Sequence, residues 1–294
     1  MKTNLNTTGT NCPALHRYRY PLRFYLLSTL IPWSLWFIAA YLSHQNNASD
    51  YGLHISLIGL LGLSGPLFIV YFLIRDDKAL LRDVVSRLLN WRSGQLLYLL
   101  TALVLMPASI LLAMAISLFF GYDIAQFSIP GHATFSSGVF PVWFLLVIAP
   151  IIEELAWHSY GTDCLRQKFN LFNTSMIFAI YWALWHLPLA SINGYYHSNL
   201  MVEGVWHSLN FLVSIFPFVL LMNWLYYKTG RNILVAVVMH LNANLFNEIF
   251  ATHPDSKIIQ TALLCLLAIT LLYFQRDFFF NNNKREPINR PVLS

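Results

Sequence analysis

The chain has 294 residues, of which 57% are hydrophobic and only 11% are charged, and its mean hydropathy is +0.54. Soluble domains of this length do not have such a balance, so the composition indicates a polytopic membrane protein. The formal net charge is +5, but the basic residues form short clusters beside apolar segments rather than one long polar face. We therefore expect membrane lipids, and no nucleic acid, among its partners.

The spans follow from the lengths of the apolar segments, because a helix needs about 20 mostly apolar residues to cross a bilayer. Residues 1–21 lack the apolar core of a removable signal peptide and are expected to form a cytoplasmic N-terminal segment. An all-α membrane domain of eight helices is predicted over 22–275, and a cytoplasmic tail over 276–294. The spans are placed at 22–43, 53–74, 95–120, 139–160, 172–190, 208–227, 232–250 and 258–275.

The basic residues test this count independently, because Lys and Arg prefer cytoplasmic loops. With both termini in the cytoplasm, every Lys and Arg except Lys257 falls on the cytoplasmic side. The inside loop 75–94 has an amphipathic period, which predicts a helix on the membrane surface with Arg82, Asp83 and Arg87 on its polar face. The polar and aromatic segments 121–138 and 191–206 are expected on the other side of the membrane.

Two adjacent carboxylates, Glu153 and Glu154, follow an apolar run that begins near Val139. An acidic side chain at membrane depth costs at least a few kcal/mol, so it is rarely kept without a partner or a task. Taken alone, the pair could be the solvated end of a helix. Two further spans also carry polar groups, however: His186 lies in one, and His240 and Asn244 lie in another.

Helical spacing shows which of these groups can act together, because residues four apart share a face. His240 and Asn244 form such a pair, as do Trp182 and His186, and Glu154 and His158. Glu153 lies about 100° around the helix from Glu154. Only one of the two carboxylates can therefore point directly at a given neighbour.

If these groups converge, they are suited to hydrolysis without a covalent nucleophile. A carboxylate in a low dielectric can act as a general base on water, with a neutral His sharing the proton transfer. A second His and an Asn amide can donate hydrogen bonds to the oxyanion that develops on an attacked peptide carbonyl. Without such convergence, each His would be a packing residue between helices.

Three segments together carry a resemblance to a known family. They are Glu153-Glu154-Leu-Ala-Trp-His158, Trp182-Ala-Leu-Trp-His186, and Tyr227-Lys-Thr-Gly230 leading to His240-Leu-Asn-Ala-Asn244. They resemble the motifs of the CAAX protease and bacteriocin-processing (CPBP, or Abi) family of intramembrane proteases, which includes the type II CAAX prenyl endopeptidases. The resemblance covers a core at about 140–250 and implies an eight-helix bundle.

The resemblance also implies roles for these residues. Glu153 would activate water together with His186, while His240 and Asn244 would stabilise the oxyanion and Glu154 would support the site. Trp182 holds the family's aromatic position. Glu248, four residues after Asn244, could be a further supporting group.

A metal is the open alternative, since the family is often labelled metalloprotease-like. Two His and a carboxylate are ligands that Zn²⁺ accepts, and Glu153, His186 and His240 would be those ligands. The chain has no His-Glu-x-x-His helix, and the oxyanion role already uses His240. We therefore expect metal-free hydrolysis, with Zn as the alternative cofactor.

The chain departs from the family pattern at His158, which stands where the family has Arg, and at Ser159, where Gly usually follows. A permanent cation beside Glu154 is thus replaced by a group that titrates near neutrality. We expect the activity to depend on pH more steeply as a result.

The sequence thus predicts an intramembrane endopeptidase that acts on hydrophobic, lipidated or membrane-associated peptides and is reached from the cytoplasmic side. The alternatives are a non-catalytic bacteriocin-immunity or secretion partner and a proton-coupled transporter. The remaining histidines, His197 among them, are expected in outer loops, too far from the site to join it.

Overall fold

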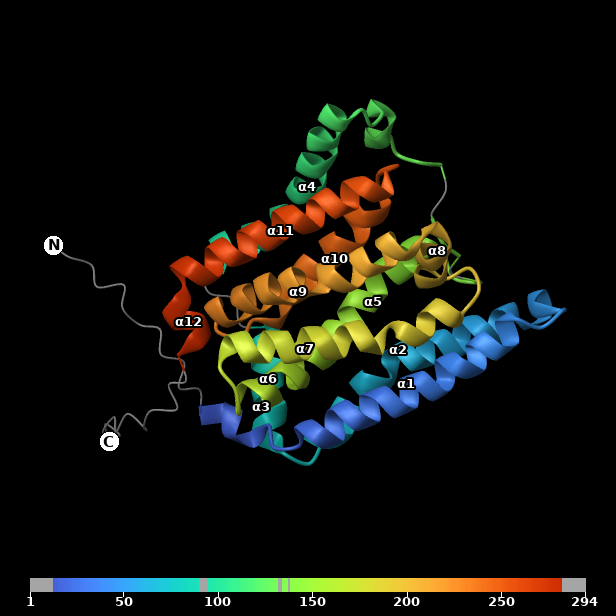
Figure 1. Cartoon of the computed structure of the whole chain (residues 1–294). Helices are drawn as coiled ribbons and strands as arrows, with labels where there is room; N and C mark the ends of the chain where they lie inside the picture. Colours follow the sequence, from blue (N-terminus) through green and yellow to red (C-terminus); the bar gives the residue numbers. More distant parts are fainter. Residues whose placement is uncertain (1–12, 90–94, 132–133, 137, 282–294) are drawn as a thin grey trace, which may run out of the picture.

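The protein is a bundle of helices, and the computed structural model contains no strand in the residues that it describes, 13–89, 95–131, 134–136 and 138–281 (Figure 1). This confirms the predicted all-α fold. Large apolar side chains such as Leu26, Phe37, Leu97 and Leu266 are exposed on the outer helices, as is appropriate for side chains that face lipid. The molecule is an integral membrane protein.

Within the described residues, six helical spans are long and apolar enough to cross a membrane. Their main helices are α1 (Pro21–Ser43), α2 (Gly52–Ile74), α4 (Leu96–Ser117), α5 (Val142–Ala156), α9 (Val205–Lys228) and α11 (Pro254–Phe274). A seventh span is bent, and α10 (Ile233–Glu248) is a shorter apolar helix of 16 residues. The expectation of about eight helices agrees with this set, and the predicted bounds differ by only a few residues.

The bent span differs from the prediction. It joins α7 (Leu171–Trp185) and the 3-10 helix η7 (Leu187–Ser191) to α8 (Tyr196–Glu203) with a bend of 85°. Pro188 lies in the first turn of η7, where it cannot supply the backbone donor needed to continue α7. The expected polar outer loop 191–206 is therefore largely a helix, α8, which contacts η7 and α9.

The predicted surface helix is present as α3 (Lys78–Leu89), but its orientation was predicted wrongly. Arg87 was expected on the polar face, yet its side chain is only 5% exposed, whereas Leu81 and Val85 are 40% and 44% exposed. The reason is an acidic partner, Asp163, which lies far away in the sequence and binds Arg87 inside the bundle.

The first residues of the predicted tail are helical. Arg276–Phe280 forms a short helix, α12, in which Phe279 is fully buried. The Phe280 ring lies 4.9 Å from that of Phe172 on α7. Residues 1–12 and 282–294, which hold most of the two predicted cytoplasmic ends, lie outside the described part of the chain.

Small residues on α2 allow α1 to approach closely, as is common between membrane helices. A methyl group at Gly62 would overlap the Trp36 indole, and the Trp36 indole N–H donates to the Gly59 carbonyl at 3.1 Å. The other side of Trp36 packs on Trp185, with ring centroids 4.6 Å apart. The α1–α2 pair thereby supports the end of α7, where His186 lies.

Candidate active site

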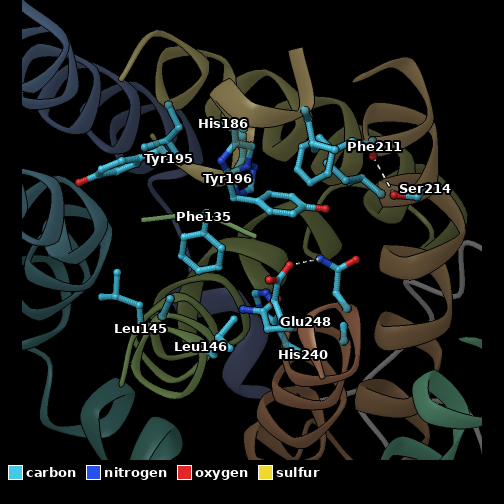
Figure 2. Close-up of a pocket in the computed structure, with 18 of the residues that line it drawn as sticks. Phe135, Leu145, Leu146, His186, Tyr195, Tyr196, Phe211, Ser214, His240 and Glu248 are labelled. Atoms are coloured by element: carbon cyan, nitrogen blue, oxygen red, sulfur yellow. Dashed lines mark hydrogen bonds between the residues drawn. The ribbon is translucent and has the colours of Figure 1, made fainter. Parts of the chain in front are cut away.

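A cavity of about 330 Å³ lies between the helices, and Figure 2 shows part of its wall. The predicted residues Glu153, Trp182, His186, His240 and Asn244 all line it, although they come from three different helices. The convergence that the sequence could only suppose is therefore present in the structure. Glu154 and His158 do not line the cavity, because they lie in the protein behind it.

Glu153 is held at the cavity wall by two indoles. Its Oε2 accepts a hydrogen bond from Trp182 Nε1 at 2.9 Å and another from Trp157 Nε1 at 3.2 Å. These bonds fix one carboxylate oxygen and leave Oε1 without a hydrogen-bond partner among the described residues. The carboxylate is thus oriented, and one of its oxygens is left for a ligand in the cavity.

Glu154 points away from the cavity, as the angle between neighbouring residues on a helix requires. Its Oε1 accepts from His240 Nδ1 at 2.7 Å, and its Oε2 makes a short contact with His158 Nδ1. Glu154 is fully buried and His240 is 5% exposed. Glu154, predicted as a catalytic group, therefore contacts His240 and does not line the cavity itself.

His158 joins Glu154 to a polar chain between helices. Its Nε2 lies 2.9 Å from Asn223 Oδ1, and Asn223 Nδ2 donates to Ser175 Oγ at 3.0 Å. Because the Ser175 hydroxyl donates to the Leu171 carbonyl, it can only accept from Asn223. This fixes the orientation of the amide and requires Nε2 of His158 to be a donor.

His186 is oriented by its own helix. Its Nδ1 lies 2.7 Å from the Trp182 carbonyl oxygen, so Nδ1 carries the proton and Nε2 is the acceptor in the neutral ring. Its ring also contacts the Trp182 indole, with centroids 5.3 Å apart. A neutral His in this tautomer can accept a proton from water in the cavity.

His197 was predicted to lie too far from the site, and this was wrong. Its ring stacks on that of His186, with centroids 5.2 Å apart and 24° between the planes, and it lines the same cavity. The cause is α8, which turns residues of a supposed outer loop back toward the bundle. No apolar period in 191–206 could have revealed this contact.

Asn244 and Glu248 differ in their partners. The Asn244 amide has no hydrogen bond within the described part of the chain, so it remains available to a ligand. Glu248 accepts from the Thr134 backbone N–H and hydroxyl and from Asn247 Nδ2. Glu248 therefore fastens the segment before α5 and does not contact Asn244 as a supporting group.

A π-helical turn, η6 (Trp157–Gly161), directly follows the two glutamates on α5. Such turns are frequent at functional sites because they alter the usual backbone hydrogen bonds. Here Arg87 donates to the carbonyl oxygens of His158 and Ser159, at 2.9 and 2.8 Å. Arg87 also pairs with Asp163 at 3.1 Å, on the helix α6 (Thr162–Arg166) that continues from the turn.

The metal site that was considered would use Glu153, His186 and His240. Among the residues that the structure describes, no three His, Cys, Asp or Glu side chains come together as ligands of one ion. Glu153 Oε2 and His240 Nδ1 already have protein partners, which leaves Glu153 Oε1 and His240 Nε2 for a ligand.

The cavity extends toward one end of the bundle. Its wall includes residues of α8 and of the first turns of α11, whereas no described residue of α3, η6 or α6 lines it. Figure 1 shows α3 and α6 at the end where α1 begins and α8 at the other end. The buried Arg87 network occupies the end of the bundle near the described termini, whereas the cavity extends toward the opposite end. Cytoplasmic termini would therefore place the cavity's wider end on the other side of the membrane, so the expectations of cytoplasmic termini and of cytoplasmic access conflict.

The sequence was then compared with known proteins. Residues 135–246 match the model of a family described as type II CAAX prenyl endopeptidase, Rce1-like. Over 266 residues the chain is 37% identical to CAAX prenyl protease 2 of Methanococcus maripaludis, an alignment that covers 90% of this chain and 97% of that protein. The chain belongs to the type II CAAX prenyl endopeptidase family.

Membership of the family confirms the resemblance seen in the motifs. The enzyme is an intramembrane endopeptidase, and the immunity-partner and transporter alternatives are not supported. The region matched to the family model contains every residue that the motifs assigned to the site.

Proposed function

We propose that this endopeptidase hydrolyses a peptide bond near the C-terminus of prenylated proteins that carry a CAAX motif. One observation carries the proposal: Glu153, His186, His240 and Asn244 line a single cavity. The part of its wall formed by α2 and α5 is mostly apolar, with Leu60, Leu63 and Leu145 among its residues. Such a wall suits a lipid-modified peptide, and the named relative is a CAAX prenyl protease.

In the proposed mechanism, Glu153 takes a proton from water as the water oxygen attacks the scissile carbonyl carbon. The neutral His186 lies on the same cavity and shares the proton transfer through Nε2. In this step His240 is the imidazolium: its Nδ1–H donates to Glu154, and its Nε2–H and the Asn244 amide donate hydrogen bonds to the oxyanion. When the C–N bond breaks, the proton held by Glu153 passes to the leaving amine.

The two indoles on Glu153 support this assignment. They fix Oε2 and so place Oε1 before the reaction begins, which lowers the cost of organising the transition state. We propose that the reaction needs no metal, because every step uses a protein group already in place.

The test is cleavage of a fluorogenic prenylated CAAX peptide by detergent-purified enzyme. Glu153→Gln should reduce kcat by at least about a hundredfold, as loss of a general base does, while a strong chelator should leave the rate unchanged. Glu203→Gln, which removes an exposed carboxylate on the rim of the same cavity, is the matched control. Loss of activity in the chelator would replace this mechanism with a metal-dependent one.

We further propose that both termini lie in the cytoplasm, since Lys257 alone among the basic residues falls on the other side of the membrane. In that orientation the cavity extends toward the opposite side. Orientation and substrate access are therefore to be measured together.

A further inference from the structure

Lys257 lies on the wall of the catalytic cavity, in the first turn of α11. No other Lys or Arg in the described part of the chain lines this cavity. Its ammonium lies 5.8 Å from the centre of the Tyr196 ring, and Tyr196 lines the cavity as well. The positive charge of Lys257 thus lies at the wall of the same cavity in which the peptide bond is to be hydrolysed.

Two acidic groups near Lys257, Asp255 and Glu248, are engaged elsewhere, and the carboxylate of Glu203 is exposed at the rim of the cavity. Asp255 accepts hydrogen bonds from the Tyr122 hydroxyl at 2.6 Å and from His207 Nε2 at 3.1 Å. Glu248 is held by Thr134 and Asn247. Within the described ranges the Lys257 ammonium has no hydrogen bond or ion pair, and its only charge-related contact is with the face of Tyr196.

A short chain of ring contacts connects Lys257 to the catalytic residues. The Tyr196 ring lies 5.6 Å from that of His197, and the His197 ring lies 5.2 Å from that of His186. Figure 2 shows Tyr196 beside His186 at the cavity wall. These ring contacts limit the distance between the His186 ring and the Lys257 ammonium to at most about 17 Å, so an extended peptide of a few residues, at about 3.3–3.6 Å each, can reach from one to the other.

We propose that Lys257 binds the C-terminal carboxylate of the substrate. This rests on the proposed function, since only a substrate cut near its C-terminus brings a free carboxylate into the cavity. In this low-dielectric chamber an unpaired carboxylate would be strongly disfavoured, whereas a charge-assisted hydrogen bond from the ammonium would retain it. The apolar wall formed by α2 and α5 would then take the prenylated part on the other side of the scissile bond.

The experiment compares two prenylated peptides that differ only at the end, one with a free C-terminal carboxylate and one with a C-terminal amide. The unsubstituted enzyme should cleave the acid with a kcat/KM roughly tenfold or more above that of the amide. Lys257→Met and Lys257→Gln should remove this preference by lowering the rate for the acid alone, and Lys257→Arg should retain it. Glu203→Gln, a charge change on the same cavity rim, should also retain the preference.

The outcomes separate this inference from the proposal on which it rests. Equal cleavage of acid and amide by the unsubstituted enzyme, or an unchanged preference in both Lys257→Met and Lys257→Gln, overturns the role of Lys257 alone. Cleavage of neither peptide by the unsubstituted enzyme overturns the proposed function as well. An unchanged rate for the amide peptide identifies a substituted enzyme that is correctly folded.

Discussion

His158 fills a position between two hydrogen-bond acceptors. The orientation of Asn223 makes Nε2 a donor, so the short contact between Nδ1 and the Glu154 carboxylate needs one more proton. With that proton, His158 and Glu154 form a hydrogen bond. Without it, a lone pair on Nδ1 and a lone pair on the carboxylate oxygen face each other and repel. The imidazole is fully buried and contacts the Tyr226 and Phe178 rings. Solvent water therefore cannot bridge Nδ1 and the carboxylate when the proton is absent.

This arrangement predicts a pH dependence with a definite sign. Loss of the shared proton would free Glu154 and, through it, His240, so the form of the enzyme that lacks this proton should be less active. His158→Arg supplies a permanent cation and should extend the active range to higher pH. The measurement is the profile of kcat/KM against pH for the two enzymes, and coincident alkaline limbs would refute the role of His158.

At the scale of the element, the π-helical turn η6 depends on Arg87. This side chain donates to two carbonyl oxygens of the turn and pairs with Asp163, and Arg231 binds Asp163 as well. The turn begins at Trp157, three residues after Glu154, so the network holds the part of the chain that continues from both carboxylates.

Arg87→Ala should therefore lower both stability and activity. Removing one partner of a buried ion pair costs about 3–5 kcal/mol, which should appear as a lower melting temperature in detergent. Arg17→Ala, which breaks the exposed pair between Arg17 and Asp77 at the same end of the bundle, should leave the melting temperature unchanged. Equal melting temperatures for the two variants would show that the network does not hold the turn.

At the scale of the whole molecule, the orientation of the protein in the membrane can be measured at two exposed serines. Ser86 lies on α3 and Ser128 lies before α5, at opposite ends of the bundle. In a chain whose native cysteines are replaced, Ser128→Cys should react with a membrane-impermeant thiol reagent added outside intact cells. Ser86→Cys should react only after permeabilisation. The reverse pattern would place the cavity on the cytoplasmic side and the termini outside.

Much of this architecture could be predicted because it depends on local patterns. Apolar length located the spans, and the four-residue spacing placed Glu154 against His158. The position of α8 could not be predicted, because its sequence has no apolar run and its place is set by contacts with η7 and α9. His197 was missed for this reason.

The inward orientation of Arg87 was missed for a related reason. Its polar side chain reads as solvent-facing in an isolated helix, and only the fold brings Asp163 and the carbonyls of η6 to it. The tryptophans on Glu153 illustrate the same limit. Trp157 and Trp182 stand within the motifs of the sequence, but their hydrogen bonds to the same carboxylate oxygen require the fold to bring Trp182 on α7 to Glu153 on α5.

The closed end of the cavity has a consequence for turnover. Because the described residues of the buried Arg87 network do not line the cavity and its wall extends to α8, we expect substrate and product to use the same passage at the α8 end. A released C-terminal peptide must diffuse out before the next chain can enter, and a peptide that stays bound occupies the site. We therefore expect the enzyme to be slowed competitively by the short peptides that it liberates, so that the rate of product escape governs how quickly successive molecules are processed.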